Sequence, residues 1–156
     1  MLKVLIADDH AIVRKGLKEI LRERPGATEI GEAGDGQSVL TMVDQEGWDI
    51  LVLDISMPRL NGLEVLRRIR LMRPDLPVLM LSMHSAGMYI EQSLKLGAAG
   101  YLSKESAPEE LLEAIDAARG GRIYISRALE RELGRGPHSG MGGATAGPHF
   151  LQHPLR

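Results

Sequence analysis

The sequence VLIADD, residues 4–9, ends a run of apolar side chains in two adjacent carboxylates, Asp8 and Asp9. Three further apolar runs end in a polar residue in the same way: ILVLD (50–54) in Asp54, VLMLS (78–82) in Ser82, and GYLSK (100–104) in Lys104. Short, continuous apolar runs are typical of strands that are buried on both faces of a parallel sheet. In such a sheet the carboxyl ends of the strands open on one edge, where ligands bind. These polar residues are therefore expected to share one pocket, although they lie far apart in the sequence.

Amphipathic stretches separate the apolar runs, and each has the pattern of a crossover helix. The first, at about 11–24, places Val13, Leu17 and Leu21 on one face. This alternation predicts an α/β fold, a flavodoxin-like doubly wound (βα)5 domain with a parallel five-stranded sheet of order 2-1-3-4-5. The order follows from the fold class rather than from individual residues. It would bring Asp8, Asp9 and Asp54 together where the strand order reverses.

The composition excludes several classes of protein. The chain has 156 residues, 44% of them hydrophobic, and a formal net charge of −2, so a core is possible but an electrostatic footprint for nucleic acid is not evident. There is no cysteine, which rules out disulfides, thiol catalysis and Cys-based zinc sites. The N-terminal sequence reads as a strand rather than a signal peptide, and no apolar run is long enough to cross a bilayer. We expect a soluble protein of the cytoplasm with no membrane partner.

Three regions are expected along the chain. Residues 1–121 contain the alternating strand and helix pattern of the domain. Residues 122–133 begin with a short extended piece and continue as an exit segment with one or two helical turns. Residues 134–156 are rich in Gly, Pro and His and lack periodicity, so we interpret them as a linker or disordered tail.

The clustered acids predict a site for Mg²⁺. This cation prefers octahedral oxygen ligands and keeps several waters, so a few carboxylates suffice. Asp9 and Asp54 are the best candidates for direct ligands, and Asp8 would bind directly or through water. A strand-end Asp alone often only caps the following helix, which remains an alternative for Asp8 by itself.

The same pocket has the residues for phosphoryl chemistry. A carboxylate such as Asp54 can attack phosphorus and form an aspartyl phosphate. Lys104 would neutralise the phosphoryl oxygens and Ser82 would donate a hydrogen bond to one of them. Taken singly, Ser82 and Lys104 are weak signals, and their positions at successive strand ends strengthen them.

The loop after Asp54 is expected to be rigid. Pro58 fixes its backbone, and Gly62, in a tight turn before the next helix, permits a positive φ. Such a loop would aim the backbone carbonyl of Ser56 at the cation. The loop is equally interpretable as an ordinary strand-to-helix connection.

The chain resembles the receiver domain of two-component response regulators. The stretches that carry the resemblance are VLIADDH (4–10), DISMPRLNG (54–62), Leu81-Ser82, and GAAGYLSK (97–104). His10, the run LSMH (81–84), Glu105 in place of a Pro after Lys104, and PEELLEAI (108–115) are similar to the NarL/LuxR-type subfamily. The resemblance covers residues 1 to about 125.

The resemblance implies a role for each site residue. Asp54 would accept phosphate from a cognate sensor histidine kinase. Asp8, Asp9, Asp54 and the Ser56 carbonyl would hold Mg²⁺, and Ser82 and Lys104 would bind the phosphoryl group. Ser82 and Tyr101 would act as the switch, with Tyr101 turning inward. Ser56 and His84, each two residues after a site residue, would tune the lifetime of the phosphoryl group.

The resemblance also implies an output. Phosphorylation would change the surface formed by the fourth helix, fifth strand and fifth helix, with a possible phosphorylation-dependent homodimer. Transcription would be controlled through a C-terminal helix-turn-helix domain, and DNA would be bound only by that domain. The sequence after Leu133 has no helical pattern with a basic face, so we expect either a truncated chain or a natural stand-alone receiver.

Two other functions fit parts of the pattern. One is a receiver-like interaction module that works without phosphorylation. The other is a haloacid-dehalogenase-type phosphohydrolase, which also uses a strand-end Asp nucleophile. That enzyme needs an acid two residues after its nucleophile, where this chain has Ser56, and its acidic pair comes late in the chain rather than first. We therefore expect a signalling domain and not an enzyme.

Overall fold

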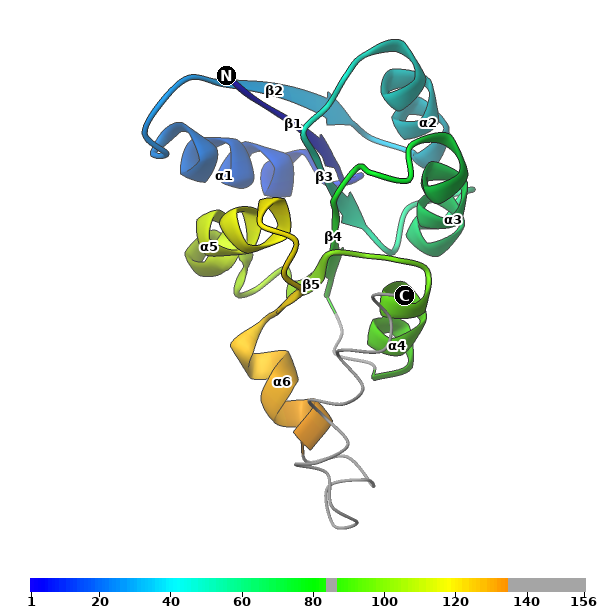
Figure 1. The fold of residues 1–156 in the computed structure, drawn as a ribbon, viewed down its shortest axis with the longest axis vertical. Coiled ribbons are helices and arrows are strands. Elements are labelled where there is room, and N and C mark those ends of the chain that lie inside the picture. The colour runs from blue at the N-terminus through cyan, green and yellow to red at the C-terminus, as the bar shows by residue number, and fades with distance from the viewer. Residues whose placement is uncertain (84–86, 135–156) are drawn as a thin grey trace.

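In the computed structural model, which describes residues 1–83 and 87–134, six parallel strands form one sheet in the order β2-β1-β3-β4-β5-β6 (Figure 1). The strands are β1 (Leu2–Ala7), β2 (Thr28–Ala33), β3 (Ile50–Asp54), β4 (Val78–Ser82), β5 (Gly100–Ser103) and β6 (Tyr124–Ile125). The helices are α1 (Ala11–Arg22), α2 (Gly36–Gln45), α3 (Gly62–Met72), α4 (Gly87–Lys95), α5 (Ala107–Arg119) and α6 (Arg127–Gly134).

The predicted α/β fold and its strand order 2-1-3-4-5 are confirmed, and the sheet has one strand more than predicted. The additional β6 pairs with β5, where Gly100 lies opposite Tyr124 and Tyr101 opposite Ile125. A strand of two residues is too short to show a periodic pattern, and the sequence indicated only an extended piece there. Close approach of the two strands requires Gly100, because a Cβ at that position would lie 2.4 Å from the carbonyl oxygen of Tyr124.

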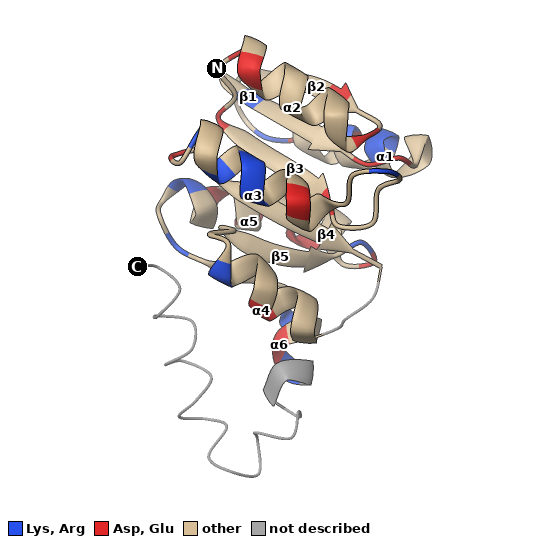
Figure 2. Ribbon diagram, turned by 90° about the vertical axis from the view of Figure 1, so that its right-hand side faces the viewer, with Lys and Arg blue, Asp and Glu red and all other residues tan. Residues whose placement is uncertain are grey.

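Helices cover both faces of the sheet. α1 and α5 pack on one face, and α2, α3 and α4 pack on the other (Figure 1). The central strands supply both cores because their side chains alternate between the faces and nearly all are buried. Figure 2 shows the consequence for charge: Lys, Arg, Asp and Glu lie mainly on helices and loops, and the central strands are almost free of them. The described helices include none that is both long and apolar enough to span a bilayer.

Polar contacts attach the segment after α5 to the domain. The backbone N–H of Ser126 donates to the carbonyl oxygen of Tyr101 at 2.9 Å. Glu110, a side chain of α5 that is 3% exposed, accepts hydrogen bonds from the Ser126 hydroxyl and, at 3.1 Å, from the backbone N–H of Arg127. A carboxylate that accepts from the first N–H of a helix stabilises that helix end. Leu129 of α6 is 2% exposed and belongs to the core on the side of α2, α3 and α4.

The predicted tail lies outside the described residues, except for Gly134 at the end of α6. The interpretation of residues 134–156 as a linker or disordered segment therefore stays a prediction.

Candidate functional site

The candidate site lies at the carboxyl edge of the two central strands. The register of β1 with β3 ends with Ala7 opposite Leu53, so the next residues on the two strands, Asp8 and Asp54, are neighbours. Both are 0% exposed, which is unusual for a carboxylate without a charged partner. The sheet therefore brings together two acids that are separated in the sequence by α1, β2, α2 and the length of β3.

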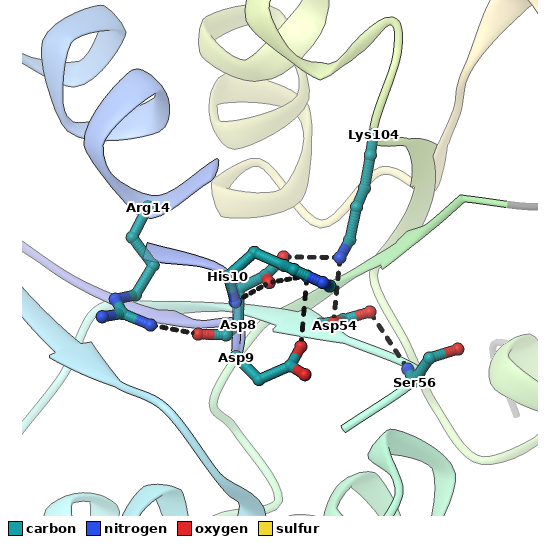
Figure 3. Close-up of polar contacts among 7 residues, drawn as sticks. All are labelled: Asp8, Asp9, His10, Arg14, Asp54, Ser56 and Lys104. Atoms are coloured by element: carbon teal, nitrogen blue, oxygen red, sulfur yellow. Dashed lines mark hydrogen bonds and ion pairs between the residues drawn. The ribbon is translucent and has the colours of Figure 1, made fainter. Parts of the chain in front are cut away.

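Four residues form a group that can hold a cation. Asp8, Asp9, His10 and Asp54 each offer one ligand atom, and these atoms lie within 4.8 Å of one another (Figure 3). Asp8 and Asp54 lie at the buried floor of the group, and Asp9 and His10 are exposed at its rim. The three carboxylates fit Mg²⁺, which takes a few oxygen ligands and retains several waters.

Lys104 lies at the floor of the site between two of the acids. It comes from the loop after β5, and its Nζ lies 2.8 Å from Asp8 Oδ2 and 3.0 Å from Asp54 Oδ2 (Figure 3). Its side chain is 4% exposed. Burial favours the neutral amine, but hydrogen bonds and charges from the two carboxylates outweigh this effect and raise the pKa of Lys104. The ammonium group is therefore held in its charged form against the two acids.

The environment of Asp54 disfavours its charge. Burial raises the pKa of the Asp54 carboxyl, and the charge of Asp8 adds to this effect. Hydrogen bonds from the backbone N–H of Ser56, at 3.0 Å to Oδ1, and from Lys104 offset part of the rise. Asp54 is thus a partly desolvated carboxylate. Its Oδ1 accepts from the Ser56 N–H and its Oδ2 accepts from the Lys104 ammonium. Such a carboxylate can react with an electrophile.

The loop after Asp54 does not use the positive φ that Gly62 permits. Gly62 does not have a positive φ, and Arg59 has one instead, at 68°. Gly62 is required because a Cβ there would lie 2.4 Å from the carbonyl oxygen of Asp54. Its N–H donates to the carbonyl oxygen of Ile55 at 2.9 Å, and the side chain of Asn61 caps α3. The start of α3 is therefore packed against the backbone of the acid itself.

Two residues join the site that the sequence had not placed there. The backbone N–H of His10 donates to Asp8 Oδ1 at 2.8 Å, and its ring Nδ1 faces both acids of the pair (Figure 3). Arg14, one turn into α1, donates to the carbonyl oxygen of Asp8 and forms an ion pair with Glu32 at 3.0 Å. In the sequence, His10 served only as one of the residues similar to the NarL/LuxR-type subfamily. Its position directly after the acidic pair was the available signal, whereas nothing in the pattern singled out Arg14.

The predicted switch residues are adjacent in the structure. Ser82 ends β4 and Tyr101 lies on the neighbouring strand β5, and their side chains are 2% and 0% exposed. Burial raises the pKa of the Tyr101 phenol, and the nearby Ser82 side chain offsets part of the rise. Tyr101 therefore points inward. His84, predicted to tune the lifetime of the phosphoryl group, lies outside the described residues.

Comparisons with known proteins agree with this geometry. Residues 4–116 match the family described as "Response regulator receiver domain". The chain is 38% identical over 143 residues to the transcriptional activator protein ExaE of Pseudomonas putida, a match that covers 92% of this chain and 67% of ExaE. It is similar to the crystal structure of a LuxR-family two-component response regulator from an Aurantimonas species, with a TM-score of 0.80, 32% identity, and coverage of 85% of this chain and 95% of that one.

A further similarity concerns a longer protein. In the structure of two RcsB dimers bound to two parallel DNAs, the RcsB chain matches with a TM-score of 0.77 and 26% identity, over 85% of this chain and 67% of that chain. Among the curated relatives, the match with the response regulator UvrY of Escherichia coli spans 61% of that protein. The chain therefore covers about two thirds or less of the length of these relatives.

Proposed function

Because the chain belongs to the response regulator receiver domain family, and within it to the NarL/LuxR type, we propose that it works by accepting a phosphoryl group on Asp54 from a sensor histidine kinase. The observation that carries the proposal is the setting of Asp54, a buried carboxylate 3.0 Å from the Lys104 ammonium and inside a cluster of acids.

The transfer requires an oxygen nucleophile and charge stabilisation. A lone pair of the Asp54 carboxylate attacks phosphorus, a P–O bond forms, and the bond from phosphorus to the kinase histidine nitrogen breaks. The Lys104 ammonium is close enough to pair with the phosphoryl oxygens once Asp54 carries the acyl phosphate, and the Ser82 hydroxyl lies at the end of the next strand to donate to them. Ser56 and His84 are proposed to limit access of the water that hydrolyses the acyl phosphate.

The acids of the site are proposed to bind Mg²⁺. Asp8, Asp9, Asp54 and the backbone carbonyl of Ser56 would hold the cation, which when bound offsets the charge that develops on the phosphoryl oxygens. The oxygen donor set of the three carboxylates fits this ion. Without the cation, Asp8 and Asp9 would place negative charge close to Asp54.

The output is proposed to pass through Ser82 and Tyr101 to the surface formed by α4, β5 and α5. Phosphorylation would bias an existing equilibrium of this surface and favour a homodimer. ExaE is named a transcriptional activator and the RcsB dimers bind DNA, so we propose that this receiver acts in the cytoplasm to control transcription, with a separate domain that contacts DNA. We propose residues 1–121 as the receiver domain, 122–133 as its exit segment, and 134–156 as linker.

The proposal is tested by the intact mass of the chain after incubation with acetyl phosphate and Mg²⁺. We expect a gain of one phosphoryl group in the wild type and none in Asp54→Asn. Asp75→Asn is the matched control, because Asp75 has an 81% exposed side chain on a loop and should be modified like the wild type. No gain in the wild type would contradict the proposal and favour an interaction module that works without phosphorylation.

A further inference from the structure

Arg14 connects the backbone of the acidic pair to the edge strand of the sheet. From the first turn of α1, its Nη1 donates to the carbonyl oxygen of Asp8 (Figure 3), and its Nε donates to Glu32 Oε1 of β2 at 3.0 Å. The side chains of Arg14 and Glu32 are 20% and 36% exposed, so both are partly covered. One guanidinium therefore holds the residue that follows β1 against the neighbouring strand β2.

The position of the Arg14 guanidinium is set by its partner Glu32. Lys18, one turn further along α1, donates to the second carboxylate oxygen, Glu32 Oε2, at 2.7 Å. Hydrogen bonds from Lys18 and Arg14 lower the pKa of the Glu32 carboxyl, which therefore stays charged at neutral pH. A guanidinium is planar and its N–H groups point in fixed directions. Once Nε is bound to Glu32, the direction in which Nη1 donates is therefore restricted.

The bond to the Asp8 carbonyl also restrains Asp9. The carbonyl of Asp8 and the N–H of Asp9 belong to one planar peptide group, so fixing the first fixes the direction of the second. The Asp8 side chain has restraints of its own, from the His10 N–H at 2.8 Å and from Lys104 Nζ at 2.8 Å. The Asp9 side chain is 30% exposed, and its contact within the described residues is with His10 Nδ1 at 3.3 Å. Asp9 therefore depends more than Asp8 on the orientation of the peptide group between them.

We propose that Arg14 is a positioning residue of the cation site, which aims Asp9 at Mg²⁺ through the Asp8–Asp9 peptide group. This inference rests on the proposed cation site. The charge of Arg14 acts in the opposite direction, because a cation beside the acids repels Mg²⁺. Removal of Arg14 therefore separates the two effects by sign: loss of positioning weakens Mg²⁺ binding, whereas loss of charge alone strengthens it.

The test is a Mg²⁺ titration of the full chain, followed by the amide resonances of residues 8–10. Arg14→Gln should raise the Kd for Mg²⁺ about tenfold, as expected when a residue that orients a metal ligand is lost. Lys18→Gln is the matched control, since it removes the same charge from the same helix and from the same partner, Glu32. Its Kd should equal that of the wild type or be lower. Binding by Arg14→Gln that is as tight as binding by Lys18→Gln would overturn the proposal.

Arg14→Lys separates geometry from charge in a second way. Lysine keeps the positive charge, but its single ammonium does not reproduce the two bonds that the guanidinium directs to Glu32 and Asp8. The Kd for Mg²⁺ should rise in this variant too, and a wild-type value would show that Arg14 acts through its charge alone. Amide resonances of β3 and β4 should keep their positions in all three variants, which verifies that each is folded.

The dependence of phosphorylation on Mg²⁺ distinguishes positioning from a general structural defect. In Arg14→Gln, the Mg²⁺ concentration that gives half the maximal rate with acetyl phosphate should rise by the same factor as the Kd. The rate at saturating Mg²⁺ should stay close to that of the wild type, because the bound ion then holds Asp9 in place. A reduced maximal rate with an unchanged half-saturating concentration would contradict the proposal.

A failure of this inference is distinguishable from a failure of the proposed function. If the wild type gains a phosphoryl group and Arg14→Gln binds Mg²⁺ like the wild type, only the role of Arg14 is wrong. If Mg²⁺ shifts none of the amide resonances of Asp8, Asp9 and Asp54 in the wild type, the cation site itself is wrong. If Mg²⁺ binds as expected but the wild type gains no phosphoryl group, the proposed function is wrong and the role of Arg14 stands.

Discussion

The Lys104 ammonium lies 3.0 Å from the Asp54 carboxylate in a pocket where the two side chains are 4% and 1% exposed. Asp8, also buried, lies on the other side of the same ammonium at 2.8 Å. One cation therefore serves two acids, and the pocket keeps an excess of negative charge away from water. Such an arrangement favours binding of a further cation at the cost of stability.

Asp54→Asn should make the folded protein more stable at neutral pH. The folded protein raises the pKa of Asp54, so ionisation of this carboxyl costs more in the folded than in the unfolded chain. The midpoint of thermal unfolding should therefore rise, and in a chain of this size each ~1 kcal/mol of added stability corresponds to about 2–4 °C. The difference should shrink as the pH falls through the raised pKa and vanish below about 3.9, the ordinary pKa of Asp. A gain that persists unchanged in acid would show that charge is not its cause.

Lys104→Met should have the opposite effect on stability. It leaves Asp8 and Asp54 buried beside each other without their cation, and loss of one partner of a buried ion pair costs about 3 kcal/mol or more. Urea unfolding at neutral pH measures the loss. Mg²⁺ should then stabilise the variant more than it stabilises the wild type, because the ion replaces the missing charge. Equal stabilisation of the two proteins would contradict the view that Lys104 and Mg²⁺ serve the same acids.

Gly62→Ala should destabilise the protein and impair phosphoryl acceptance together. The new methyl group would lie 2.4 Å from the carbonyl oxygen of Asp54 and 2.6 Å from Cα of Ile55, and backbone atoms cannot be moved cheaply. We expect a loss of about 1–3 kcal/mol, typical of overpacking. Gly16→Ala is the matched control: Gly16 lies within α1, its Cβ would contact nothing within 4 Å, and the change should stabilise by about 0.5–1 kcal/mol. Comparable stability of the two variants would exclude the predicted clash.

Glu110→Ala should release β6 and α6 from the domain. The substitution leaves the Ser126 hydroxyl and the Arg127 N–H without their buried acceptor, at a cost of about 1–3 kcal/mol. Hydrogen exchange should become faster in residues 124–131 and stay unchanged in β1 and β3. Glu109→Ala, at the exposed neighbouring position, should alter neither quantity. Unchanged exchange in α6 of the Glu110 variant would show that apolar packing of Leu129 alone holds the helix.

The sequence predicts the parts of the fold that depend on long apolar patterns. Continuous runs such as 50–54 and 78–82 identify strands buried on both faces, and they locate Asp54 and Ser82 at strand ends without further information. The neighbourhood of Asp8 and Asp54 then follows from the order of a doubly wound sheet, which the structure confirms.

Local backbone geometry is what the sequence pattern does not predict. The direction of the His10 ring depends on the dihedral angles at the start of α1, and Arg14 reaches the carbonyl oxygen of Asp8 from the first turn of α1. Gly62 was correctly singled out, but the close approach of two backbones explains it rather than a positive φ. Glu110 is buried because Ser126 and Arg127, beyond the end of α5, supply its hydrogen bonds. The helical pattern of α5 does not predict this burial.

The hydrogen bond from the Ser126 N–H to the Tyr101 carbonyl anchors the start of α6 to β5. The phenol of Tyr101 lies beside Ser82, and the carbonyl of the same residue receives the N–H that precedes the first turn of α6. A shift of the Tyr101 backbone would therefore be transmitted directly to the residue before α6. The position of the segment after α5 is thus tied to a residue that lies beside Ser82, the strand-end hydroxyl of the proposed site.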